Sequence, residues 1–115
     1  MCIIVYKPQG KQLPSTDTLR ACWDNNPDGA GIMWAASDHV SIRKGFMAWP
    51  DFLEALDEVT SSIDVENTPM ALHFRIATHG AVVPGCCHPF AVKGSFAKMR
   101  ATKIDASVGF MHNGT

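Results

Sequence analysis

Short runs of hydrophobic residues alternate with polar turns along this chain, and the runs predict its strands. Residues 2–6 are an apolar, β-branched run closed by a Lys-Pro-Gln-Gly turn, which predicts a buried strand at the very N-terminus. A Ser-Asp turn between the next two runs predicts a hairpin. The later runs with strand character are residues 32–35, 40–43, 70–78, 89–92 and 108–112.

Two stretches carry apolar residues at helical spacing instead. The first follows N-cap candidates at 15–18, continues through Leu19, Cys22 and Trp23, and is stopped by an Asn-Asn-Pro sequence. The second has a proline in its first turn and then an apolar stripe. That stripe consists of Phe52, Leu53, Leu56 and Val59. The remaining long stretches, 61–69 and 93–105, are predicted to be loops.

The order of these elements favours hairpins over strict alternation of strands and helices. We therefore expect one α+β domain with a mainly antiparallel sheet. The last strand runs into Asn-Gly, a strong hairpin signal, and no returning strand follows. This ending predicts that residues 1–115 are the N-terminal portion of a longer domain, or that a partner chain, including a second copy of this one, completes the sheet.

Composition narrows the function classes. Hydrophobic residues make up 46% of the chain and charged residues 18%, which is enough apolar material for a core. The net charge is -1 and no basic stripe is present, so a nucleic-acid surface is not expected. The sequence has no apolar stretch of about 18 residues and no signal peptide, so we expect no membrane span and a cytoplasmic location.

The four cysteines do not indicate a disulfide framework or a metal site. Without a secretory signal, thiols are expected to stay reduced. Cys86, Cys87 and His88 are adjacent, whereas paired zinc ligands usually need a spacer to converge on one ion. We therefore expect neither a metal nor another cofactor.

Cys2 has the most distinctive chemistry in the chain. Methionine aminopeptidases remove Met1 when the second residue is small, as Cys is. Removal leaves a thiol and a free α-amine on one residue, and an amine with a reference pKa of about 7.7–8.0 is partly unprotonated near neutral pH. It can then act as the base for its own thiol. The alternative interpretation is a small apolar residue at the start of a strand.

Residues 73–80, His-Phe-Arg-Ile-Ala-Thr-His-Gly, place several polar side chains in an otherwise apolar strand. Alternate residues of a strand share a face, so His73, Arg75 and His79 are predicted on one face and Thr78 on the other. A buried charge needs a partner, and arginine is suited to bidentate binding of a carboxylate. The alternative is an edge strand with a solvated polar face.

Two further segments combine asparagine with glycine. Asn113 and Gly114 follow the last strand, and an Asn side-chain amide with the next backbone N–H can form an oxyanion hole. An ordinary hairpin turn is the commoner use of this pair. Residues 26–31, Asn-Pro-Asp-Gly-Ala-Gly, lack the Lys-Ser or Lys-Thr of a phosphate-binding loop. We interpret them as a tight turn between helix and strand.

Taken in order, these segments resemble the class II glutamine amidotransferases, whose glutaminase domains are N-terminal nucleophile hydrolases. That family combines an N-terminal Cys, an Asp-Gly or similar turn before Ala/Ser-Gly, a His-x-Arg-x-Ala-Thr-His-Gly segment, a His-Pro pair and a His-Asn-Gly segment. The third block is the most specific, and every defined position agrees here. The matching residues are Cys2, 28–31, 73–80, 88–89 and 112–114.

The resemblance implies an αββα sandwich of the N-terminal nucleophile hydrolase type, of which this chain would be the N-terminal portion. It also implies hydrolysis of the side-chain amide of glutamine. Cys2 would attack the amide carbon to give a thioester and ammonia, and its α-amine would shuttle the proton. Asn113 and Gly114 would bind the oxyanion.

The resemblance implies a substrate pocket as well. Arg75 would bind the α-carboxylate of glutamine, and Thr78 and His79 would line the pocket. Typical members pass ammonia to a synthase domain or subunit, so glutamine and such an acceptor are the expected partners. The family clamps the substrate amino group with an Asp further along the chain, past Thr115, and often has Asn where Cys86 stands. We therefore predict that residues 1–115 alone have no glutaminase turnover.

Three other interpretations stay open. One is an N-terminal-cysteine hydrolase of γ-glutamyl peptides or other linear amides, whose substrates also carry a carboxylate for Arg75. Another is a non-catalytic binding or regulatory module that keeps the fold. The third is a Cys–His dyad enzyme that uses Cys86 or Cys87 with His79 or His88.

Overall fold

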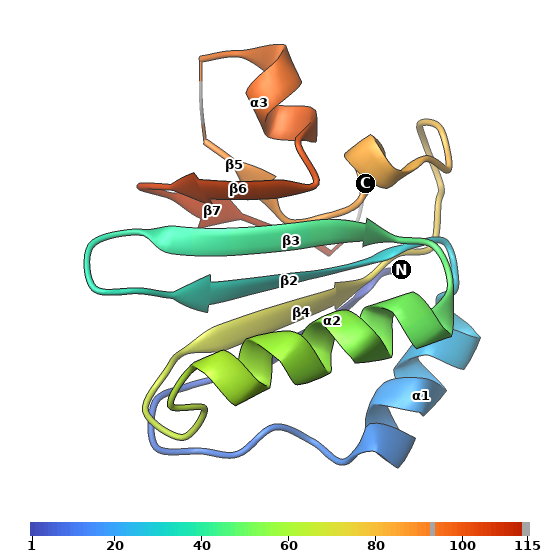
Figure 1. Ribbon diagram of the computed structural model, residues 1–115. Coiled ribbons are helices and arrows are strands. Elements are labelled where there is room, and N and C mark those ends of the chain that lie inside the picture. The colour runs from blue at the N-terminus through green and yellow to red at the C-terminus, as the bar shows by residue number, and fades with distance from the viewer. Residues whose placement is uncertain (93, 114–115) are drawn as a thin grey trace.

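A computed structural model describes residues 1–92 and 94–113, and the fold is α+β, as the sequence predicts. The arrangement of the elements is shown in Figure 1. In chain order they are β1 (Ile3–Lys7), α1 (Thr16–Asn25), β2 (Ala30–Ala35), β3 (Val40–Phe46), α2 (Trp49–Ser62), β4 (Met70–Phe74), the 3-10 turn η1 (Pro84–Cys86), β5 (Phe90–Ala91), α3 (Phe96–Arg100), β6 (Lys103–Ala106) and β7 (Gly109–Phe110).

The main sheet has five strands in the order β1-β4-β2-β3-β6, and every neighbouring pair is antiparallel. The predicted hairpin is confirmed, with Met33 of β2 opposite Ile42 of β3. β4 lies between β1 and β2, so the alternative that residues 73–80 form an edge strand is wrong. Ile3 stands opposite Phe74, which places the start of β1 beside the end of β4.

Helices α1 and α2 cover one face of this sheet (Figure 1) and form the main core with it. α1 begins as predicted, because the Ser15 hydroxyl accepts a hydrogen bond from the Thr18 backbone N–H at 3.2 Å. Phe52 of α2 packs edge-on against Phe74 of β4, with 5.2 Å between ring centroids. The fully buried side chains of this core include Leu19, Ala30, Ile32, Phe52, Met70, Leu72 and Phe74.

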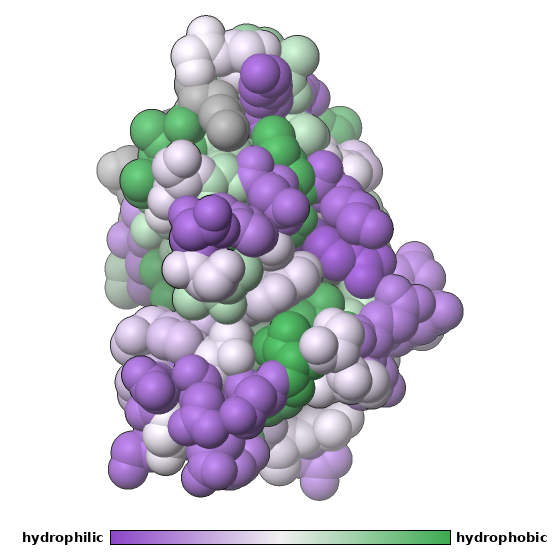
Figure 2. Space-filling model, turned by 60° about the vertical axis from the view of Figure 1, so that its left-hand side comes forward, coloured by the Kyte–Doolittle hydropathy of each residue, from purple (hydrophilic) through white to green (hydrophobic). Residues whose placement is uncertain are grey.

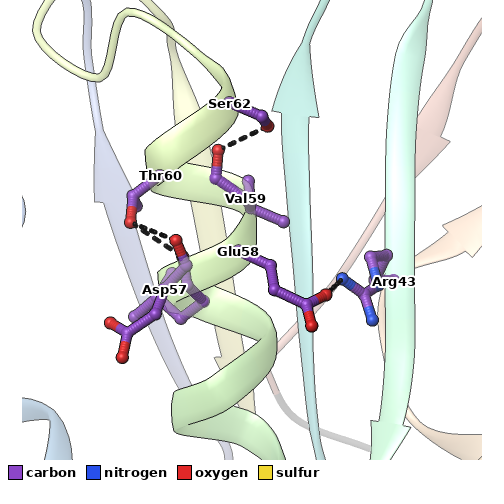
Figure 3. A network of polar contacts seen from close by, with 7 residues as sticks. Arg43, Asp57, Glu58, Val59, Thr60 and Ser62 are labelled. Atoms are coloured by element: carbon purple, nitrogen blue, oxygen red, sulfur yellow. Dashed lines mark hydrogen bonds and ion pairs between the residues drawn. The ribbon is translucent and has the colours of Figure 1, made fainter.

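One ion pair joins α2 to β3, and further polar contacts lie within α2 (Figure 3). Arg43 Nη1 donates to Glu58 Oε2 at 2.9 Å, which joins the two elements. Near the end of the helix, the Thr60 and Ser62 hydroxyls donate to backbone carbonyls of the preceding turn. Because these groups are partly exposed, we expect them to contribute less to stability than the aromatic core.

The other face of the sheet carries a small second sheet made of β5 and β7. A Cβ added to Gly109 of β7 would meet Met33, Val40 and Ile42, so this strand lies directly on β2 and β3. The fold therefore stacks a helical layer, a five-stranded sheet and a two-stranded sheet. Apolar side chains also remain at the surface, in small patches among polar ones (Figure 2).

Three predicted boundaries are wrong. The strand predicted over 70–78 ends at Phe74, because the backbone of Arg75 bonds to the turn before β2 and the Ala77 N–H donates to the Asp28 carboxylate at 2.9 Å. The strand predicted over 108–112 is reduced to β7. The loop predicted over 93–105 contains α3 and most of β6.

The unpredicted elements depend on distant contacts. β6 pairs with the edge of β3, and the Ser41 hydroxyl donates to Asp105 Oδ1 at 2.7 Å across that pair. The segment itself shows no clear apolar period, so tertiary pairing decides its structure. No helix in residues 1–92 and 94–113 is long and apolar enough to cross a membrane.

Candidate functional site

Cys2 lies at the end of the sheet where β1 begins and β4 ends. The Met1 carbonyl oxygen accepts a hydrogen bond from Asn26 Nδ2 at 2.6 Å, so the N-terminal segment is held. The half-buried Cys2 thiol points toward the backbone carbonyl oxygen of Ile76, with 3.7 Å between sulfur and oxygen. The end of α1 and the segment that follows β4 therefore hold Cys2 on two sides.

A cavity of about 330 Å³ opens beside this thiol. It brings together Cys2, Arg75, Thr78 and His79, four of the residues singled out from the sequence. The full lining is Cys2, Arg75, Ile76, Thr78, His79, Gly80, Cys86, His88, Phe90 and His112. Thr78 and Arg75 line the same cavity because β4 has already ended, so the prediction that they lie on opposite strand faces is wrong.

A larger, shallower hollow of about 610 Å³ lies on the outer side of α2. Its lining contains carboxylates but no cysteine, histidine or arginine. These residues are Pro50, Leu53, Glu54, Asp57, Glu58 and Ser61. The smaller cavity beside Cys2 is therefore the better candidate for a reactive site, because it combines a nucleophile with a cation.

Arg75 shapes one wall of the cavity. Its side chain is only 6% exposed, and it donates through Nη1 to the Ala81 carbonyl oxygen at 2.7 Å and through Nη2 to the His79 carbonyl oxygen at 3.0 Å. These bonds curve the loop 79–81 around the guanidinium. None of the ion pairs in the described part of the chain involves Arg75, so its charge is available to an anionic ligand.

Three imidazoles stand together at the cavity: His88 and His112 line it, and His73 lies behind His88. The His73 ring is fully buried and stacks on His88, with 4.2 Å between centroids and 17° between planes. The His112 ring meets His88 edge-on at 4.6 Å. His73 Nε2 lies 3.1 Å from the His112 carbonyl oxygen, and a carbonyl only accepts, so this nitrogen carries the hydrogen.

The two buried imidazoles are neutral at neutral pH. Burial lowers the pKa of His73 to about 4, although its hydrogen bond to the His112 carbonyl acts in the opposite direction. Burial, together with the charges that neighbouring basic groups can carry, His73 first among them, lowers the pKa of His88 to about 3. The Nδ1 atoms of both rings are buried and have no hydrogen-bond partner among residues 1–92 and 94–113. Neither ring can therefore serve as a ready source of positive charge.

Two glycines allow this arrangement: Gly29 in the turn before β2, and Gly31 in β2 itself. A Cβ on Gly29 would collide with the Cys87 sulfur, and Gly29 also has a φ of 121°, which favours glycine. A Cβ on Gly31 would collide with the His88 carbonyl oxygen. The segment that carries His88 can therefore lie directly on β2, and the interpretation of residues 26–31 as only a tight turn is incomplete.

The adjacent cysteines differ sharply from each other. Cys86 is half-buried and lines the cavity, whereas Cys87 is 0% exposed and packs against Met47 and Val83. Burial raises the pKa of Cys87, which disfavours the nucleophilic thiolate. The structure therefore argues against Cys87 as the nucleophile of a Cys–His dyad. All four cysteines are free.

The predicted oxyanion residues lie at the edge of the described chain. Asn113 is exposed and does not line the cavity, although His112 before it does. Gly114 lies outside the described residues. Sequence reasoning assigned no role to His112 or Asn26. The His-Pro and His-Asn-Gly matches pointed toward His88 and His112, but Asn26 gave no signal, because its partners are backbone carbonyls.

No group of three or more His, Cys, Asp or Glu side chains in residues 1–92 and 94–113 is arranged to hold a metal ion. Comparison of the chain with known protein families, curated proteins and solved structures found no significant match. The geometry of the site is therefore the main support for a function.

Proposed function

We propose that this chain is the N-terminal portion of the glutaminase domain of a class II glutamine amidotransferase, with Cys2 as its nucleophile once Met1 is removed. The observation that carries this proposal is the convergence of Cys2, Arg75, Thr78 and His79 on one cavity. These side chains come from the N-terminus and from a segment more than seventy residues away. A cavity of about 330 Å³ is near the lower end of ligand-site sizes, which suits a single amino acid.

In the first half of the reaction, the thiol sulfur of Cys2 attacks the side-chain amide carbon of glutamine. The thiol proton passes to the Cys2 α-amine, and the carbonyl oxygen becomes an oxyanion. Asn113 and Gly114 are proposed to donate hydrogen bonds to that oxyanion. The protonated α-amine then gives its proton to the leaving nitrogen, so ammonia departs and a thioester remains on Cys2.

In the second half, water attacks the thioester carbon. The α-amine accepts the proton of this water and returns it to the departing sulfur, which releases glutamate and restores the thiol. Arg75 holds the substrate α-carboxylate throughout, since its guanidinium is buried at the cavity wall and has no ion-pair partner in the described chain. The ammonia is proposed to pass to a synthase domain or subunit in the cytoplasm.

The layer order supports the fold that goes with this chemistry. Helices α1 and α2, the five-stranded sheet, and the β5–β7 sheet on its other face correspond to three successive layers of an αββα sandwich. We propose that the chain folds as the N-terminal part of such a sandwich. The site, and not the fold, carries the functional proposal.

Protection of Cys2 from alkylation tests the substrate. The Met1-free chain is treated with iodoacetamide, and peptide mass spectrometry measures modification at Cys2 and, as an internal control, at Cys22 on α1. L-Glutamine is expected to slow modification of Cys2 but not of Cys22, whereas butyramide, which lacks the α-carboxylate and α-amine, should slow neither. Protection only by longer γ-glutamyl peptides would favour the hydrolase of linear amides. No protection by any of these ligands would contradict the proposal and favour a non-catalytic module.

A further inference from the structure

Asn26 is a buried polar side chain that the proposed reaction does not yet use. It is 5% exposed, and its Nδ2 donates to the Met1 carbonyl oxygen at 2.6 Å. A second contact, to the Phe74 carbonyl oxygen, is much longer at 3.4 Å. The short hydrogen bond of Asn26 is therefore made to the residue that maturation removes.

The backbone around Asn26 is fixed on both sides. Asn26 ends α1, and its N–H donates to the carbonyl oxygens of Cys22 and Trp23. Two residues later, the Asp28 N–H donates to the Arg75 carbonyl oxygen at 2.9 Å. The carboxamide is thus held between the start of β1 and the end of β4, and it cannot follow Met1 when that residue leaves.

Removal of Met1 changes what this carboxamide meets. Hydrolysis of the Met1–Cys2 peptide consumes one water, carries the Met1 carbonyl away as a carboxylate, and leaves an α-amine on Cys2. A buried amide N–H without a partner costs about 1–3 kcal/mol. Peptide geometry puts the Met1 oxygen about 2.3 Å from the Cys2 nitrogen. The new amine therefore starts within about 5 Å of Asn26 Nδ2, and a small shift or one bridging water closes this gap.

We propose that Asn26 is a positioning residue: in the mature chain its carboxamide becomes the hydrogen-bond partner of the Cys2 α-amine and holds that amine beside the thiol. The inference rests on the proposed N-terminal nucleophile and adds a residue to it. The amine is the base of the reaction, so its orientation decides whether the thiol proton reaches it. The same carboxamide serves the precursor by holding Met1 and the mature chain by holding Cys2.

A charge placed at position 26 tests this directly. Asn26→Asp puts a carboxylate beside the α-amine, which stabilises its protonated form. The pKa of the amine, followed by ¹³C NMR of the Cys2 Cα in a cysteine-labelled chain, is expected to rise by about one unit or more. Asn25→Asp is the matched control. Its side chain is exposed and bonds within α1 to Ala21, so the same charge one residue away should leave the amine titration unchanged.

Other charged or titratable groups near the amine are the same in both variants, so they do not account for a difference between them. They are Asp28 on the same turn, Arg75 and His79 after β4, and Cys86, His88 and His112 across the cavity. If Asn26 were only a structural contact, Asn26→Asp would have a lower free energy of unfolding, but the pKa of its Cys2 α-amine would equal that in Asn25→Asp. That result would overturn the inference.

A second variant covers the case in which Asn26→Asp does not fold. Asn26→Ala removes the partner without adding charge, so acetylation of the Cys2 α-amine at fixed pH is expected to become several-fold faster than in Asn25→Ala. Equal rates would overturn the inference. Loss of Met1 and a reactive Cys2, together with no difference between the position 26 and position 25 variants, would leave the proposed function standing. Retention of Met1 would contradict both the proposed function and this inference.

Discussion

His73 Nε2 donates to the backbone carbonyl oxygen of His112 over 3.1 Å, which ties the buried strand β4 to the chain immediately before Asn113 and Gly114. The first histidine of the 73–80 segment thus holds the segment proposed to supply the oxyanion hole. The His88 ring also joins the two segments, because it stacks on His73 and meets His112 edge-on. Two blocks that the sequence presented separately are one structural unit.

Removal of the His73 donor should loosen that unit. His73→Met keeps a similar volume but leaves the His112 carbonyl without its donor, so we expect a loss of about 1–3 kcal/mol in the free energy of unfolding. His73→Gln can place an amide N–H at the same point and should retain more of that stability. Urea unfolding measures both. Equal stability of the Met and Gln variants would show that the hydrogen bond contributes nothing.

The buried imidazoles also predict how stability depends on pH. In the unfolded chain each imidazole has the usual pKa of 6.5. In the folded chain the pKa is about 4 for His73 and about 3 for His88. The unfolded state therefore binds more protons between these values, and stability falls as the pH drops below about 6.5. The loss should approach about 2 kcal/mol per ring by pH 5.

Urea unfolding between pH 7.5 and 5 measures this dependence. His88→Gln removes one of the two rings and should flatten the profile. His39→Gln is the control, because His39 lies on the β2–β3 turn and pairs with the exposed Asp38. A profile that is equally steep in the native chain and in His88→Gln would contradict the assignment of His88 as a buried neutral ring.

Arg75 should determine recognition of the substrate carboxylate. Arg75→Lys keeps the charge but loses the planar fork, so labelling of Cys2 by a glutamine-analogue diazoketone at low concentration should slow by roughly 10–100-fold. Arg43→Lys is the matched control on β3, where the partly exposed pair with Glu58 is worth at most about 1 kcal/mol of stability. The rate of labelling, followed by mass spectrometry, should be unchanged in that control. Equal slowing in both variants would count against a role of Arg75 at the site.

The close approach of the His88 segment to β2 predicts a steric effect. Gly31→Ala places a methyl group onto the His88 carbonyl oxygen, so the segment must shift, at a cost of about 1–3 kcal/mol. Gly94→Ala is the control, since a Cβ there meets nothing within 4 Å. Thermal unfolding compares the two. A Gly31→Ala chain as stable as Gly94→Ala would mean that this segment does not pack on β2 as described.

Local patterns were sufficient for the elements that bury a regular apolar face. The stripe through Phe52, Leu56 and Val59 predicted α2, and the Ser-Asp turn predicted the β2–β3 hairpin. The same patterns failed where distant atoms decide. β4 stops at Phe74 because the turn before β2 takes the backbone hydrogen bonds of Arg75, and β6 forms because β3 offers it an edge. Neither partner is visible in a local sequence window.

The predictions for the site succeeded and failed for the same reasons. Cys2, Arg75, Thr78 and His79 were identified by residue type, order and resemblance, and they share a cavity. The assignment of their faces was wrong, because it assumed that the strand continued past Phe74. Asn26 was predicted only to end the first helix and to begin a turn, since nothing in its neighbours along the chain indicates that it bonds to the Met1 carbonyl.

The most direct test of Cys2 as a terminal nucleophile is intact-mass spectrometry of the expressed chain, before and after treatment with a glutamine-analogue diazoketone. We predict that Met1 is absent and that one adduct forms, which Cys2→Ala abolishes and Cys86→Ser retains. Retained Met1 with no adduct, or an adduct that persists in Cys2→Ala, would contradict the assignment of Cys2.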